Sequence, residues 1–102
     1  MSKGIKILIV EDDENLRFLV VHRLTSEGYE VLEVSDGESA QNSIMSEKPD
    51  IVLLDWMLPG KQGSEVCEEV RKQGFENLII MMTSKAQDVE RSMRIILVYR
   101  IM

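Results

Sequence analysis

The chain has 102 residues, of which 12 are Lys or Arg and 18 are Asp or Glu, so its formal net charge is −6 and its pI is about 4.8. This length allows one domain, and 44% apolar residues supply a core without disulfides or a structural metal. The acidic balance and the few aromatic residues exclude a direct nucleic-acid binder. No apolar run is long enough to span a membrane, and no signal-peptide pattern precedes the first one, so we expect a cytoplasmic protein.

Four short apolar runs predict β-strands. They are rich in Ile, Val and Leu and are too short for helices. Three runs contain continuous apolar stretches, at residues 7–10, 51–54 and 78–82, which are typical of strands covered on both faces. Acidic residues interrupt the second run and predict an edge strand. In chain order the runs are residues 5–10, 29–34, 51–54 and 78–82.

Segments with helical spacing lie between and after these runs. In the first, apolar residues recur at helical intervals between an N-cap at Asp13 and a glycine at Gly28 just past the end. The second opens with a capping-box pattern at residues 35–38, and the third lies between residues 64 and 74. A fourth helix is expected to begin at the Ser-x-x-Gln pattern of residues 84–87.

Strands that alternate with helices of this length predict repeated βαβ units. Their crossover connections are right-handed and their sheet is parallel. The expected fold class is therefore α/β, a doubly wound parallel sheet. Because the sequence has no internal repeat, low-complexity tract or linker, residues 1–102 are expected to form a single domain.

Acidic residues follow two of the predicted strands. Glu11, Asp12 and Asp13 come after the first strand, and Asp55 comes after the third. Ligands of an open parallel sheet bind outside the carboxyl ends of its strands, so Glu11, Asp12 and Asp55 converge if these strands are neighbours. Clustered carboxylates repel one another unless a cation joins them, and oxygen ligands suit Mg²⁺. Because Mg²⁺ pairs with phosphate oxygens, the pattern indicates phosphoryl chemistry with Asp55 as the candidate nucleophile.

The loop after Asp55 and the end of the fourth strand complete the predicted site. A Pro-Gly pair shapes a tight turn in this loop, and Gly63 is expected to adopt an unusual backbone angle before the third helix. Such a loop can aim the Met57 carbonyl at a metal ion. Thr83 is expected to offer its hydroxyl to a phosphoryl oxygen bound to Asp55.

Three segments, at residues 7–13, 50–60 and 79–84, together resemble the receiver domain of bacterial two-component response regulators. Each segment is a weak signal alone, but the three in this order and at this spacing are specific. The resemblance implies a flavodoxin-like receiver fold with strand order 2-1-3-4, and a signalling module rather than an enzyme. The segment at 54–60 is similar to receivers attached to winged-helix transcriptional regulators, which implies a role in transcription regulation.

Transferred to the matching residues, the resemblance implies that Asp55 takes a phosphoryl group from a sensor histidine kinase. It also implies that Asp12 binds Mg²⁺ directly, that Glu11 binds it through water and that the Met57 carbonyl is a further ligand. Thr83 takes the role of the switch hydroxyl, which moves toward the phosphoryl group and changes the partner surface.

The resemblance ends at about residue 93. The family continues with a fifth strand, which ends in a Lys-Pro pair, and a fifth helix, and its lysine would fall beyond Met102. In their place the chain has an apolar run at 95–98, which either adds a replacement strand or, within a continuing helix, packs against a second molecule. We therefore expect a receiver that is truncated or altered after about residue 93 and that forms a homodimer or a domain-swapped dimer.

Two other functions remain open at this point. A receiver remnant without its lysine would act as a non-phosphorylated dimerisation module. A phosphohydrolase with an aspartyl-phosphate intermediate would need Asp-x-Asp after the first strand, where this chain has Glu11, Asp12 and Asp13. The plain structural alternative for these three residues is a solvated acidic turn that caps the first helix.

Three further residues have structural interpretations. Cys67, the only cysteine, is expected to be a small buried hydrophobe. Trp56 is expected to be a partly exposed aromatic at the rim of the site. His22 is expected at the surface of the first helix, away from the site.

Overall fold

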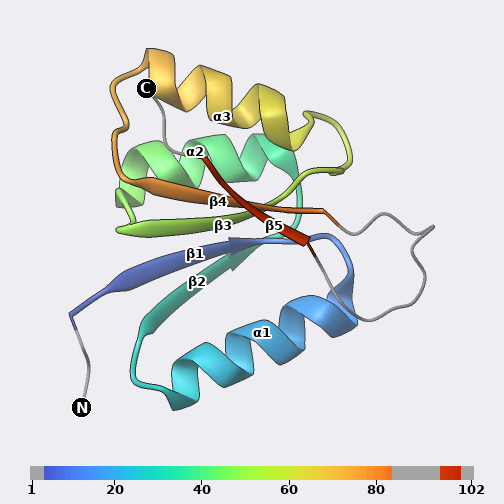
Figure 1. The fold of residues 1–102 in the computed structure, drawn as a ribbon, viewed down its shortest axis with the longest axis vertical. Helices are drawn as coiled ribbons and strands as arrows, with labels where there is room; N and C mark the ends of the chain where they lie inside the picture. Colours follow the sequence, from blue (N-terminus) through green and yellow to red (C-terminus); the bar gives the residue numbers. More distant parts are fainter. Residues whose placement is uncertain (1–3, 84–94, 100–102) are drawn as a thin grey trace.

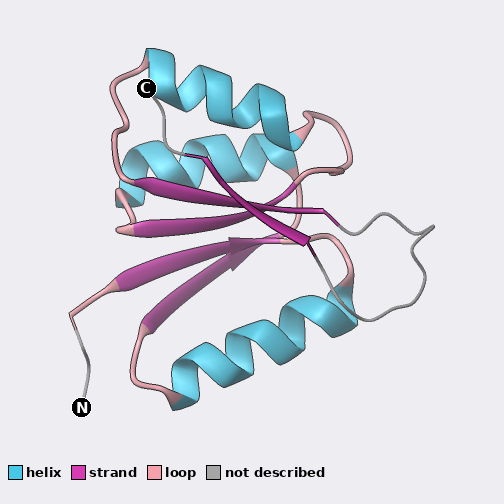
Figure 2. Ribbon diagram, in the orientation of Figure 1, coloured by secondary structure: helices cyan, strands magenta, loops and turns pink. Residues whose placement is uncertain are grey.

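The structure, a computed structural model, describes the backbone of residues 4–83 and 95–99 and the side chains of residues 4–82. One five-stranded sheet has α1 on one face and α2 and α3 on the other (Figures 1 and 2). The strands are β1 (Lys6–Val10), β2 (Glu30–Val34), β3 (Ile51–Asp55), β4 (Leu78–Thr83) and β5 (Ile95–Tyr99), and the helices are α1 (Glu14–Ser26), α2 (Gly37–Glu47) and α3 (Gly63–Lys72).

All four predicted strands form and pair in parallel in the order β2-β1-β3-β4, which confirms the predicted topology. As its interrupted pattern predicts, β2 lies at one edge of the sheet. The register places Val10 of β1 beside Leu54 of β3, and Asp55 beside Met82 of β4. The carboxyl ends of β1, β3 and β4 therefore meet at one edge, where α/β folds bind their ligands.

β5 is the outermost strand on the side of the sheet opposite β2, and it pairs with β4 in the antiparallel direction (Figure 1). Its register runs from Thr83 beside Ile95 to Ile79 beside Tyr99. The run at 95–98 thus adds a replacement strand, the first of the two alternatives above, and its direction is opposite to that of the four parallel strands. The fourth helix predicted from residues 84–87 lies outside the described residues.

The hydrophobic core lies between the sheet and the two helices α2 and α3. Its largest fully buried side chains include Leu8, Ile44 and Leu54. Burial of this kind is the main stabilising term of the fold. In contrast, α1 has no buried residue, and its side chains Phe18 and Leu19 are 65% and 61% exposed.

Helix ends follow the predicted capping residues with one correction. The Asp13 carboxylate accepts a hydrogen bond from the Leu16 N–H at 3.1 Å and caps α1 as predicted. The N-cap of α2 is Asp36, whose carboxylate accepts from the Ser39 N–H at 2.7 Å. The capping box expected to open at Ser35 is therefore wrong by one residue, because extended backbone at Asp36 aims that carboxylate at the first turn.

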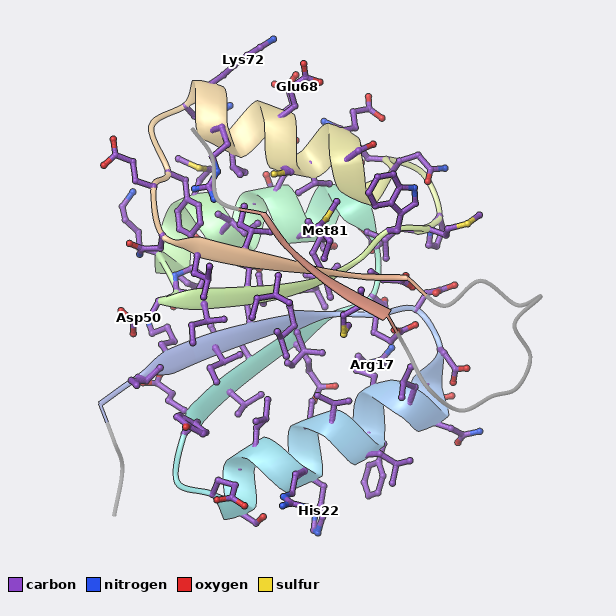
Figure 3. The ribbon with its side chains drawn as sticks, in the orientation of Figure 1. Arg17, His22, Asp50, Glu68, Lys72 and Met81 are labelled. Atoms are coloured by element: carbon purple, nitrogen blue, oxygen red, sulfur yellow. The ribbon has the colours of Figure 1, made fainter. Side chains whose placement is uncertain are left out.

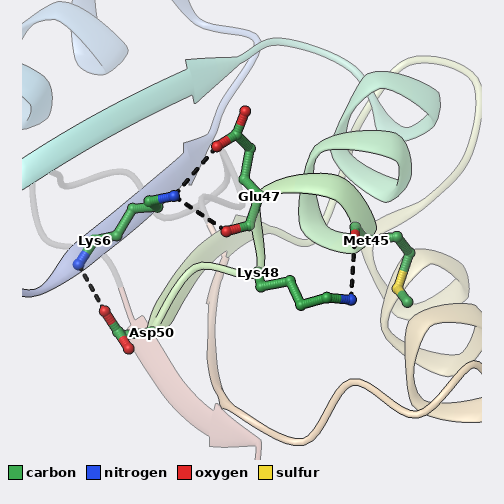
Figure 4. A network of polar contacts seen from close by, with 5 residues as sticks. All are labelled: Lys6, Met45, Glu47, Lys48 and Asp50. Atoms are coloured by element: carbon green, nitrogen blue, oxygen red, sulfur yellow. Dashed lines mark hydrogen bonds and ion pairs between the residues drawn. The ribbon is translucent and has the colours of Figure 1, made fainter.

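A polar network fixes the end of the sheet opposite the acidic residues (Figure 4). The backbone N–H of Lys6 donates to Asp50 Oδ2 at 2.8 Å, and the Asp50 N–H donates to the Lys6 carbonyl at 2.8 Å. Lys6 Nζ also pairs with Glu47 Oε1 at 3.2 Å. This exposed ion pair contributes about 1 kcal/mol or less, but the reciprocal backbone contacts hold β1 and β3 in register.

Candidate functional site

Three carboxylates converge at the carboxyl edge of the sheet. Glu11 and Asp12 directly follow β1, Asp55 ends β3, and one oxygen from each lies within 4.8 Å of the others. Glu11 and Asp55 are each 2% exposed, whereas Asp12 is exposed. The predicted convergence of Glu11, Asp12 and Asp55 is therefore confirmed, and the plain solvated-turn interpretation does not describe Glu11.

Backbone contacts set the position of Glu11. Its N–H donates to the Val34 carbonyl at the end of β2 at 3.2 Å, and its Oε2 accepts from the Asp13 N–H at 3.1 Å. The Asp13 carboxylate itself caps α1 and is not one of the clustered carboxylates. Asp13 is thus a helix cap, as predicted.

The loop after Asp55 folds back on this aspartate. The Met57 N–H donates to Asp55 Oδ1 at 3.3 Å, and the Trp56 N–H donates to the Met82 carbonyl at 2.8 Å. The Gly63 N–H closes the loop by donating to the Trp56 carbonyl at 3.0 Å. These contacts hold one carboxylate oxygen of Asp55 against the loop backbone.

Gly63 is required for a reason other than the predicted one. Its backbone is not in the left-handed region, whereas Gly60 in the same loop has a φ of +75°. A Cβ at position 63 would overlap the Asp55 carbonyl oxygen and lie 3.0 Å from the Trp56 Cα. The start of α3 therefore packs directly on the Asp55 peptide, and only glycine allows this approach.

The other predicted site residues lie around the three carboxylates. The Thr83 backbone ends β4, one residue after Met82, the register partner of Asp55, and the Thr83 side chain lies outside the described part of the chain. Met57 lies two residues after Asp55, and its side chain is 51% exposed. A ligand role for its carbonyl stays a prediction. Trp56 is 37% exposed at the rim, as predicted.

Two structural interpretations are confirmed away from the site. Cys67 is 6% exposed on α3, and burial raises the pKa of its thiol above its ordinary value despite the nearby Arg71 guanidinium. His22 is exposed on α1, where its ring stacks on Phe18 with 5.9 Å between ring centroids.

Two contacts near the site were not predicted from the sequence. The Arg17 guanidinium donates to the Glu11 carbonyl at 2.8 Å, and Lys61 Nζ in the loop after Asp55 donates to Gln41 Oε1 on α2 at 2.6 Å. Arg17 follows its cap Asp13 by one helical turn, so helical spacing alone could have placed it near the cluster. No sequence pattern pairs Lys61 with Gln41, because the loop conformation brings them together.

The donor set fits a hard divalent cation. Three carboxylate oxygens close together carry excess negative charge, and two of the three residues are nearly closed to solvent. Oxygen donors without imidazole or thiolate suit Mg²⁺, which keeps several waters when few protein ligands hold it. The exposed position of Asp12 leaves room for those waters.

The family model for the response regulator receiver domain matches residues 7–98. This chain belongs to the receiver-domain family. Receiver domains are signalling modules of two-component systems that interact with sensor histidine kinases and bind Mg²⁺ at an acidic pocket. This receiver domain has an acidic cluster formed by Glu11, Asp12 and Asp55.

Solved structures agree with this assignment. The BeF₃-activated N-terminal receiver domain of RstA from Klebsiella pneumoniae is 40% identical, with 81% of this chain and 70% of that chain covered at a TM-score of 0.74. The response regulator TrrA from Thermotoga maritima, determined with Mg²⁺ and BeF, is 36% identical, with 87% and 77% covered at 0.74. A DNA-binding response regulator of the LuxR family from Staphylococcus aureus is 31% identical, with 79% and 69% covered at 0.73.

In the described part of this receiver domain, no helix is long and apolar enough to cross a membrane.

Proposed function

We propose that this receiver domain accepts a phosphoryl group on Asp55 from the phosphohistidine of a sensor histidine kinase. The observation that carries the proposal is the convergence of Asp55 with Glu11 and Asp12 at the carboxyl edge of β1 and β3. In this proposal Asp12 holds Mg²⁺ directly, Glu11 holds it through water, and the Met57 carbonyl is a further ligand. We also infer that the domain works in the cytoplasm, where the kinase would phosphorylate it.

The proposed transfer is a displacement at phosphorus. One carboxylate oxygen of Asp55 forms a bond to phosphorus while the bond from phosphorus to the kinase imidazole nitrogen breaks, and the imidazole leaves with that electron pair. The Met57 N–H, which lies 3.3 Å from Asp55 Oδ1, orients the carboxylate. Bound Mg²⁺ would neutralise charge on the phosphoryl oxygens and the carboxylates.

The signal would leave the site through Thr83 at the end of β4. Its backbone position beyond Met82, the register partner of Asp55, supports a switch role in which its hydroxyl moves toward the phosphoryl oxygens. The changed surface would then act on an attached or separate partner. Similarity to the Staphylococcus aureus DNA-binding regulator supports transcription regulation as the output, with DNA bound by another domain.

Beryllofluoride, which mimics a phosphoryl group on aspartate, tests this proposal. With Mg²⁺ present it is expected to shift the amide resonances around Asp55 and Thr83 in the wild type. The Asp55→Asn variant provides the matched control, since its amide oxygen can still accept from the Met57 N–H while the reactive carboxylate is removed. An Asn variant that responds like the wild type would contradict the proposal.

A second candidate function is self-association without phosphorylation. It is favoured by β5, which is the outermost strand of the described sheet and has the uncharged sequence Ile-Ile-Leu-Val-Tyr. Edge strands without charge or proline pair readily with other strands. Sedimentation at several protein concentrations is expected to show a dimer, which Leu97→Lys should weaken; a monomer throughout would exclude this function.

A further inference from the structure

The side chain of Arg17 joins the ends of two strands at the acidic cluster. Its Nη1 donates to the Glu11 carbonyl at 2.8 Å, and its Nε donates to Glu33 Oε1 of β2 at 3.0 Å. The Arg17 side chain is 19% exposed, against 50% for Glu33. Figure 3 shows Arg17 on the side of α1 that faces the sheet, with His22 on the outer side of the same helix.

The hydrogen bond from Arg17 to the Glu11 carbonyl holds a peptide group that links two residues of the carboxylate cluster. The Glu11 carbonyl belongs to the peptide that links Glu11 to Asp12, and both residues contribute an oxygen to the cluster. On its other side, the Glu11 N–H is fixed to the Val34 carbonyl of β2 at 3.2 Å. Arg17 and β2 therefore fix Glu11 from both sides.

We propose that Arg17 is a positioning residue for the cation site. Its side chain fixes the conformation of the turn that carries Glu11 and Asp12. This inference rests on the proposed Mg²⁺-dependent function. The required property is the planar guanidinium, whose Nε and Nη1 reach two acceptors at once, and not the positive charge alone. A lysine ammonium at this position keeps the charge but lacks this fixed two-donor geometry.

The charge of Arg17 and its geometry predict opposite effects on Mg²⁺ affinity. A cation beside an acidic site opposes a second cation, so loss of the charge alone would tighten Mg²⁺ binding. Loss of the positioning contacts would weaken binding, because residues that orient metal ligands affect affinity strongly. The direction of the change therefore separates the two roles.

Titration of Mg²⁺, followed by the fluorescence of the single tryptophan Trp56, tests the inference. We expect Arg17→Lys and Arg17→Met each to weaken Mg²⁺ binding about 10-fold or more. Arg17→Lys with wild-type affinity, or Arg17→Met with tighter binding, would overturn it. If the wild type itself binds no Mg²⁺, the proposed function fails, and the positioning role fails with it.

A second readout separates positioning from helix stability. Arg23 on the same helix pairs with Glu27 at 3.1 Å through the same Nε atom, but its side chain is 74% exposed. Arg23→Met thus removes an equivalent ion pair outside the site and is expected to leave Mg²⁺ affinity unchanged. In the metal-free protein, Arg17→Lys should shift the amide resonances of Glu11 and Asp12. Unchanged resonances, or equal loss of affinity in Arg23→Met, would overturn the inference.

Discussion

Glu11 and Asp55, each 2% exposed, bring a carboxylate oxygen to within 4.8 Å of each other at the ends of neighbouring parallel strands. The register of β1 and β3, with Val10 beside Leu54, fixes this proximity. Two buried carboxylates so close together destabilise the fold unless a cation or a proton balances them. The same repulsion that lowers stability therefore provides the driving force for cation binding.

Removing one charge from this pair is expected to stabilise the metal-free protein. In EDTA at low salt, Asp55→Asn should raise the free energy of unfolding by about 1 to 3 kcal/mol, because one repulsive charge is lost. Thermal unfolding with and without Mg²⁺ measures both effects. Mg²⁺ should raise the melting temperature of the wild type and have little effect on the variant. A variant that is less stable in EDTA would contradict this prediction.

Asp12 and Asp13 are expected to have separable roles. Asp12→Asn should weaken Mg²⁺ binding strongly, since Asp12 is one of the clustered carboxylates. Asp13→Asn should bind Mg²⁺ like the wild type, because asparagine also caps helices. Asp13→Ala should cost about 1 kcal/mol of stability through the lost cap. Calorimetric Mg²⁺ titration and urea unfolding of these variants check the assignment, and normal Mg²⁺ binding by Asp12→Asn would refute it.

Gly63 and Gly60 test the packing of the loop on Asp55. Gly63→Ala should lower stability by about 1 to 3 kcal/mol, because the new Cβ overlaps the Asp55 carbonyl and displaces α3. Gly60→Ala places its Cβ in open space and should cost only about 1 kcal/mol of backbone strain. Urea unfolding compares the two, and an equal loss in both would argue against close packing at Gly63.

Cys67 predicts a stability difference at alkaline pH. Burial raises the pKa of this thiol in the folded state above its ordinary value of 9.0. The contribution of the neutral thiol to the free energy of unfolding is therefore fully present below pH 9.0 and is lost as pH rises through the folded-state pKa. Between the unfolded-state and folded-state pKa values, the thiol ionises only in the unfolded chain. From pH 8 to pH 10, the urea midpoint of unfolding should fall further in the wild type than in Cys67→Ala. Equal decreases would show that the thiol ionises alike in both states.

The parallel part of the fold was predictable because each element carries a local signal. Continuous apolar runs indicated the buried strands, acidic interruption indicated the edge strand β2, and Asp13 and Gly28 marked the ends of α1. The convergence of Glu11 with Asp55 was predictable because parallel strands bring their carboxyl ends together.

The remaining features depend on tertiary contacts that no local pattern encodes. The direction of β5 follows from its pairing with β4, which an apolar run alone does not specify. The need for glycine at position 63 arises from the approach of α3 to the Asp55 peptide, and not from the unusual backbone angle that the sequence suggested. The contact of Arg17 with Glu33 joins α1 to β2, which helical spacing alone does not specify.

Chemical mapping of the phosphorylated residue tests most directly whether Asp55 accepts the phosphoryl group. The domain is incubated with acetyl phosphate and Mg²⁺, reduced with borohydride, which converts an aspartyl phosphate to homoserine, and analysed by peptide mass spectrometry. If Asp55 accepts the phosphoryl group, homoserine appears at position 55 in the wild type, dependent on Mg²⁺, and is absent in Asp55→Asn. Homoserine at another aspartate, or none in the wild type, would contradict it.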